Sequence, residues 1–122
     1  MIPGLKERLT FTQLVNPGNQ TGTPTSSALD TLGYEGDLVA IQQVGTRTLG
    51  TLTGKIQDSA DGSSDWQDVT GYAFTAVAAS SNLQTMRVDT RAVRRYVRYV
   101  GTLASSPNLD MAAAICGQLK RQ

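Results

Sequence analysis

Residues 109–120, LDMAAAICGQLK, alternate between two sets of side chains. One set is mostly large and apolar: Leu109, Met111, Ala113, Ile115, Gly117 and Leu119. The other set is Asp110, Ala112, Ala114, Cys116, Gln118 and Lys120. A period of two predicts a β-strand with its first set in the core. Because the middle of the second set is small and apolar rather than charged, we expect a loop or another subunit to cover it.

The same period recurs in other segments that are rich in Thr, Val, Gly and Ser and are separated by turn residues. They are residues 7–15, 36–44, 49–59, 82–90 and 94–104. From the alternation we expect these side chains to point inward: Leu52, Gly54, Ile56, Met86, Val88, Val97, Tyr99, Gly101 and Leu103. No long segment repeats apolar residues at helical spacing. The pattern predicts an all-β fold, an antiparallel β-sandwich or jelly roll of about seven or eight strands.

Length and charge limit the protein class. A chain of 122 residues suits a single domain, residues 1–122, with its own core. The formal charge of +1 gives no global field that would recruit nucleic acid or an anionic membrane. No apolar run has the length of a signal peptide or of a membrane span. We therefore expect a soluble protein, made in the cytoplasm, that recognises its partner by shape.

Residues 16–37 depart from the strand rhythm because they are rich in Gly, Pro, Thr and Ser. Such a long connection is usually functional or flexible, so we interpret it either as an interaction arm or as a flexible loop. We expect residues 1–37 to form a first strand followed by this arm or loop, and residues 38–122 to form the sandwich core. On the arm reading, Asn16, Pro17 and Tyr34 are candidate contacts with a partner.

The sequence offers no catalytic centre. It contains no histidine, which removes the Ser-His-Asp and Cys-His arrangements and the most common general base near neutral pH. The single cysteine, Cys116, lies in the middle of a predicted strand, and a buried structural thiol is favoured over a nucleophile. No acidic pair stands out for glycoside hydrolysis, and no glycine-rich phosphate loop precedes a helix. We expect neither enzymatic activity nor a cofactor.

The stretch KIQDSADGSSDWQDV, residues 55–69, reads as the tip of a hairpin. Its aspartates supply oxygen ligands, but their spacing is not that of a calcium-binding loop, so a metal site is disfavoured. The favoured reading is a turn at Asp61 and Gly62, with Ser63, Ser64 and Asp65 bonding the loop backbone. Trp66 then folds over the sandwich edge. A third reading makes Trp66 an aromatic contact framed by polar residues.

Arginines are interleaved with tyrosines in residues 89–100, DTRAVRRYVRYV. Arg94, Tyr96 and Arg98 share one strand face, and Arg95 points the other way, which argues against a nucleic-acid groove. Two other interpretations of this strand face are favoured over nucleic-acid binding. The face is solvated, with arginine stems covering apolar surface, or it is a protein interface in which arginines pair with a neighbour's carboxylates.

Three segments together resemble a family: IQDSADGSSDWQDV, LQTMRVDTRAVRRYVRYVGTLA and MAAAICGQL. Across roughly residues 36–119 the chain resembles the small β-sandwich capsid decoration, or cement, proteins of tailed bacteriophages. The resemblance implies a protein on the capsid exterior that braces contacts between major capsid subunits, often as a trimer. The same turn and strand also resemble discoidin-like carbohydrate-binding β-sandwiches, although this chain lacks their bracketing cysteines and an obvious aromatic platform.

These observations lead to one hypothesis about function and two alternatives. The hypothesis is a structural virion protein that binds the phage major capsid protein, with a homo-oligomer possible and no nucleic acid, membrane or metal involved. Its candidate contacts are Trp66, Arg94, Tyr96 and Arg98, together with the arm. One rival is a carbohydrate-binding module that stacks sugars on Trp66 and Tyr72. The other is a structural protein of the phage tail or neck.

Overall fold

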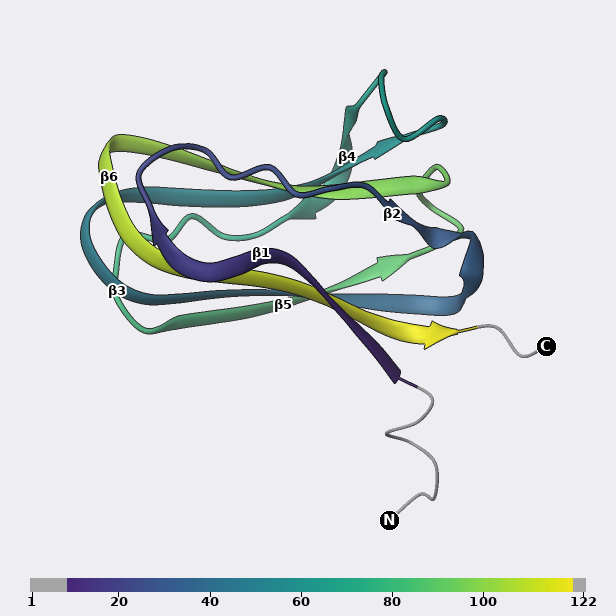
Figure 1. Ribbon diagram of the computed structural model, residues 1–122, viewed down its shortest axis with the longest axis horizontal. Helices are drawn as coiled ribbons and strands as arrows, with labels where there is room; N and C mark the ends of the chain where they lie inside the picture. Colours follow the sequence, from purple (N-terminus) through teal and green to yellow (C-terminus); the bar gives the residue numbers. More distant parts are fainter. Residues whose placement is uncertain (1–8, 120–122) are drawn as a thin grey trace, which may run out of the picture.

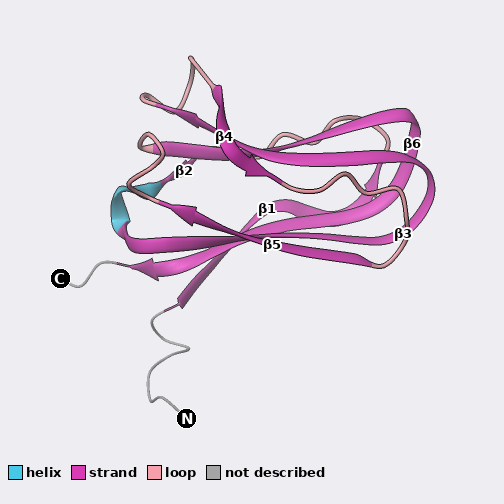
Figure 2. Cartoon of the chain, turned by 180° about the vertical axis from the view of Figure 1, so that it is seen from behind, coloured by secondary structure: helices cyan, strands magenta, loops and turns pink. Residues whose placement is uncertain are grey.

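A computed structural model describes residues 9–119 as an antiparallel β-sheet of six strands with one short 3-10 helix (Figure 1, Figure 2). The all-β prediction is confirmed. The strands are β1 (Leu9–Gln20), β2 (Leu29–Asp30), β3 (Tyr34–Ser59), β4 (Gln67–Ala73), β5 (Asn82–Asp89) and β6 (Tyr96–Leu119). The helix η1 spans Thr31–Gly33.

Two long strands, β3 and β6, build both layers of the fold. They pair with each other almost from end to end and bend at the same end of the molecule (Figure 1). Layer A contains β1, β5, residues 34–44 of β3 and residues 109–119 of β6. Layer B contains β2, β4, residues 51–59 of β3 and residues 96–104 of β6. A single hydrogen-bonded sheet therefore folds over itself into a two-layer sandwich.

The structure has six strands where the sequence indicated seven or eight, because four of the predicted segments merge in pairs at the bend, while β2 and β4 were not among those segments. The pairing of β3 with β6 shifts register between Val44 and Thr51, as expected where a strand turns a corner. Gly50 has φ +95° and lies against the other strand, so that a Cβ there would come within 2.5 Å of Pro107 Cα. Because the hydrogen bonding continues through the corner, two predicted pairs of strands each become one bent strand.

The core lies between the two layers and follows the predicted alternation. The inward side chains of residues 109–117 are buried, and so are those of Leu52, Ile56, Val88, Val97 and Tyr99. The predicted inward residues Met86 and Leu103 are half-buried against the same core. The side chain of Leu119 and residue Lys120, which the pattern placed on opposite faces, lie outside the described residues.

One polar pair lies at the centre of this core. The Tyr99 hydroxyl donates a hydrogen bond of 2.6 Å to Gln42 Oε1, and both side chains are fully buried. Gly54 makes room for them, since a Cβ at Gly54 would overlap Gln42 Oε1 and lie 2.5 Å from the Tyr99 hydroxyl oxygen. Gly101, which pairs with Gly54 across the strands, leaves space for the Tyr99 ring in the same way.

Residues 16–37 lie on the sandwich rather than apart from it. Strand β1 continues to Gln20 through two register shifts, the second of which, between Val15 and Gly18, contains Pro17. The next residues run along β6, where the Ser26 amide donates to the Tyr99 carbonyl at 2.9 Å. The part of the predicted arm in residues 1–8 lies outside the described residues. In residues 9–119, no helix is long and apolar enough to cross a membrane.

Candidate protein interface

The turn interpretation had Ser63, Ser64 and Asp65 bonding the loop backbone, but the loop between β3 and β4 is organised by Asp61. Its carboxylate accepts hydrogen bonds from the Ser63 amide at 3.0 Å and from the Ser64 amide at 2.9 Å. These bonds, the Ser64 amide first, hold the pKa of Asp61 well below its ordinary value. Gly62 has φ +79°, a conformation that glycine adopts without strain. The loop Ser59–Trp66 is therefore fixed by its own side chains.

Arg94 clamps this loop from outside. Its guanidinium donates to Asp58 Oδ1 at 3.1 Å and to Asp65 Oδ2 at 2.9 Å. It also donates to the backbone carbonyls of Asp58 and Asp65, each at 2.8 Å. These partners, Asp65 first, raise the pKa of Arg94. Arg94 is thus paired with carboxylates of its own chain and positions the loop, whereas the interface reading had those arginines pairing with a neighbour's carboxylates.

Trp66 and Arg98 form a cation–π pair at the base of the clamped loop. The Arg98 guanidinium lies over the Trp66 ring, with its Cζ 4.4 Å from the ring centre. Gln57 fixes the arginine by accepting a 2.9 Å hydrogen bond from Arg98 Nε. Both side chains remain partly exposed. The pair is therefore a preorganised amphipathic contact of the kind common at protein interfaces.

Tyr96 completes the cluster. A Cβ added to Gly62 would lie 3.0 Å from the Tyr96 ring, so the loop backbone packs directly on this ring. The Arg95 guanidinium lies 5.0 Å from the ring centre and pairs with Asp30 at 2.8 Å. Four residues chosen from the sequence thus converge at one end of the sandwich. We call Trp66, Arg94, Tyr96 and Arg98 the loop cluster.

The other three candidates lie elsewhere. Asn16 and Pro17 are exposed on β1 in layer A, whereas the loop cluster belongs to layer B. Tyr34 is only 9% exposed and packs in the core near Gly117, so its ring is not displayed to a partner. The sequence placed Tyr34 on an arm because the preceding residues are small and polar. In fact β3 begins at Tyr34 and directs the ring inward.

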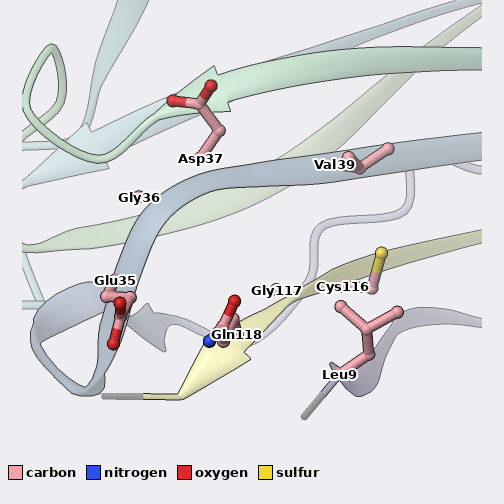
Figure 3. A pocket seen from close by; sticks show the side chains of 8 residues that line it. All are labelled: Leu9, Glu35, Gly36, Asp37, Val39, Cys116, Gly117 and Gln118. Carbon is pink, nitrogen blue, oxygen red and sulfur yellow. The ribbon is translucent and has the colours of Figure 1, made fainter. Parts of the chain in front are cut away.

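A second surface was only partly indicated by the sequence. The side of layer A that points away from the core exposes large apolar side chains: Phe11 (65% exposed), Leu83 (64%) and Val39 (36%). Cys116 lies beside Val39 on this side and is partly exposed, not buried as expected (Figure 3). We call this side the outer face. Among residues 9–119 no loop covers Phe11, Leu83 or Val39.

Two shallow hollows mark the outer face. One, of about 410 Å³, lies at the open end of the sandwich between Leu9, Glu35, Asp37 and Cys116 (Figure 3). The other, of about 240 Å³, lies near the bend and is lined by Pro17, Gly18, Gln43, Gly45, Asp110, Met111 and Ala112. The alternation in residues 109–120 indicated that the part of this face contributed by β6 is apolar. The parts contributed by β1, β3 and β5 were not indicated, because they depend on which strands pair.

The described side chains do not assemble a metal centre or an aromatic platform. No group of three potential metal ligands occurs within residues 9–119. Asp58 and Asp65 are paired with Arg94, and Asp68 lies 3.0 Å from the Lys55 ammonium. The Tyr72 hydroxyl accepts a hydrogen bond from the Asp89 amide at 3.1 Å, which ties this ring to β5.

Comparisons with known proteins identify the fold. No protein-family model matches the sequence, and no curated protein sequence matches it. Among solved structures, the chain is similar to the crystal structure of the PBSX exported protein XepA, with a TM-score of 0.67 and 16% identity over 93% of this chain. It is also similar to a chain in the structure of infectious bursal disease virus, Gx strain, with a TM-score of 0.51 and 14% identity over 89% of this chain. It spans 38% and 31% of those two chains.

Proposed function

We propose that this protein is a non-enzymatic structural component of a phage particle, which binds the outer surface of the capsid and braces contacts between major capsid subunits. The fold supports the proposal, because it is shared with a phage exported protein and with a chain of a virus structure. The family resemblance of residues 36–119 points to the same class. On this proposal the protein acts by binding alone.

The observation that carries the proposal is the preorganised loop cluster. Asp61 and Arg94 fix the loop in one conformation, and Arg98 holds the Trp66 ring from one side. A rigid aromatic anchor loses little conformational entropy when it binds, which is how a small surface reaches useful affinity. On a repeating lattice, multivalent display further strengthens modest contacts.

The carbohydrate-binding rival has less support in the geometry. A sugar stacks on an open aromatic face, and one face of Trp66 is already occupied by the Arg98 guanidinium. Tyr72, the second ring of that reading, packs against the core and is bonded through its hydroxyl to β5. The two rings therefore do not present a joint platform.

The test is binding to particles. Labelled protein is sedimented with purified phage particles from the native host that have been depleted of this protein, and contacts are identified by cross-linking and mass spectrometry. We expect saturable binding and cross-links to the major capsid protein. Cross-links to tail or neck proteins would move the protein within the virion and overturn the capsid assignment. Absence of binding to any particle component would overturn the proposal as a whole.

A variant pair locates the contact. Truncating an aromatic hot spot usually costs more than about 2 kcal/mol of binding free energy, so we expect Trp66→Ala to weaken particle binding by roughly 30-fold. Leu49→Ala is the matched control, because Leu49 is 54% exposed near the bend, at the opposite end of the sandwich. Equal losses in the two variants would show that the loop cluster is not the contact.

A further inference from the structure

The outer face has two adjacent columns of different size. The β6 column is small: Ala112, Ala114 and Cys116. The β3 column is larger: Gln43, Ile41 and Val39, each paired across the strands with the corresponding β6 residue. The two columns lie in the middle of layer A, with β1 beside β6 and β5 beside β3. A column of small side chains therefore runs beside a column of larger side chains through these three rows.

Such a face is complementary to itself. Consider a two-fold axis that lies midway between two facing copies, parallel to the strands and over the boundary between β3 and β6. It would lay each large column on the small column of the second copy. Val39 would meet the partner's Cys116, Ile41 the partner's Ala114, and Gln43 the partner's Ala112. Alternating large and small residues across two facing layers is how sheets interdigitate. A two-fold axis across the strands would instead place large on large and small on small.

The edges of the face fit the same axis. Leu83, at the β5 edge, lies in one cross-strand row with Gln43 and Ala112, and the hollow near Pro17 is at the β1 end of that row. The axis would place each exposed Leu83 over the partner's hollow. In another row, Phe11 lies at the β1 edge and Arg87 at the β5 edge. Phe11 would then meet the partner's Arg87 in a cation–π contact.

The charges on the face are compatible with this pairing. Asp37 already has a partner in its own chain, since its carboxylate lies 3.3 Å from Arg87 Nε. Glu35 pairs across the strands with Gln118, so the axis would set it opposite the partner's Gln118 amide. Asp110 accepts a hydrogen bond from Asn19 and would face the partner's Gly45, which has no side chain. Within residues 9–119, the axis sets none of Glu35, Asp37 and Asp110 against a carboxylate of the partner.

We propose that the outer face is a homodimer interface, in which two copies pack layer A against layer A about this two-fold axis. Four strands about 4.8 Å apart, each with about seven residues at about 3.3 Å, give a face of roughly 400 Å² per copy. That is below the roughly 800 Å² per partner of a standard interface, so the dimer is expected to dissociate at micromolar concentrations. The inference does not depend on the proposed capsid contact, which uses the loop cluster.

Sedimentation velocity over a concentration series from about 1 to about 200 µM tests the interface. We expect a monomer–dimer equilibrium that Phe11→Lys and Leu83→Lys each weaken by at least tenfold. Leu32→Lys and Leu49→Lys are matched controls, because both side chains are more than half exposed but lie off the outer face, and they should leave the equilibrium unchanged. A wild-type monomer throughout the series, a trimer, or equal effects of all four changes would overturn the proposal.

Cross-linking tests the axis itself. In a Cys116→Ser background, Gln13→Cys with Thr85→Cys places the two thiols on β1 and β5 in one row, three strand spacings apart within a chain. About 14 Å separates them in one copy, whereas the axis sets Gln13 opposite the partner's Thr85. A bis-maleimide too short for the intrachain span should give a covalent dimer. Gln13→Cys with Gln67→Cys, which lies in layer B, should not, and equal yields would refute the axis.

Discussion

Removing one buried hydroxyl should destabilise the protein measurably. In Tyr99→Phe, the only atom lost is the hydroxyl oxygen that donates to Gln42 Oε1 at 2.6 Å. Gln42 is fully buried, and within residues 9–119 its Nε2 has no hydrogen-bond partner. The hydroxyl is therefore the one described group that satisfies this amide, and the variant would leave the whole amide unpaired in the core.

The expected loss follows from that geometry. Leaving a buried polar group unsatisfied costs about 1–3 kcal/mol, more than the net value of an ordinary hydrogen bond. For a domain of this size each kcal/mol corresponds to about 4 °C in melting temperature, so Tyr99→Phe should melt about 4–12 °C lower. Gln42→Met alone should also destabilise, because it leaves the tyrosine hydroxyl buried without an acceptor.

The double variant separates this explanation from simple loss of packing. Replacing both partners by apolar groups of similar shape removes the unsatisfied atoms, so Tyr99→Phe with Gln42→Met should recover most of the stability lost in either single variant. Urea unfolding followed by circular dichroism measures all four free energies of unfolding. If the two losses simply add, the buried hydrogen bond is not what couples these residues, and the reasoning is refuted.

Three further outcomes follow from the same core and from the clamped loop. Gly54→Ala should lower the free energy of unfolding by about 1–3 kcal/mol through overpacking, measured by urea titration; an unchanged midpoint would mean that the core can shift. Burial raises the pKa of Tyr99 above its unfolded value of about 10, so its contribution is complete below pH 10 and is lost as pH rises beyond it. Thermal melts should show a shallower alkaline loss for Tyr99→Phe than for the wild type, and identical slopes would contradict this. Arg94→Lys cannot reproduce the forked contacts to Asp58 and Asp65, so Trp66 fluorescence anisotropy should fall while the melting temperature of the core changes little; unchanged anisotropy would mean that Arg94 does not hold the loop.

The strands were predictable because burial imposes a period of two. Residues 109–117 alternate in the structure as they do in the sequence, and Leu52 and Val97 point inward as expected. The corners were not predictable. GTRTLG and ASSPN look like turns that end strands, yet β3 and β6 continue through them because each supplies the other with hydrogen-bond partners around the bend. That continuity depends on pairing across more than fifty residues, which local sequence does not encode.

The loop cluster was identified by residue type but not by its contacts. Trp66 and Arg98 stood out as an aromatic and a cation, but their stacking depends on the pairing of β3 with β6. Arg94 was placed on a shared strand face, whereas it lies before the start of β6 and turns back to Asp58, 36 residues away. Most of the outer face was missed for the same reason, since its four strands come from distant parts of the chain.

The pairing of β3 with β6 along their whole length predicts an order of folding. Their pairs near the clamped loop, such as Ser59 with Tyr96, close a loop of 37 residues (96 minus 59), whereas Tyr34 with Leu119 closes 85 (119 minus 34). Loop closure costs less entropy for shorter loops, so layer B should assemble first and template layer A around the corner. Pulsed hydrogen exchange during refolding should then protect the amides of Ile56 and Tyr99 before those of Ala40 and Ile115, and the reverse order would refute this. A newly made chain would consequently present its outer face last, after the rest of the molecule is already in place.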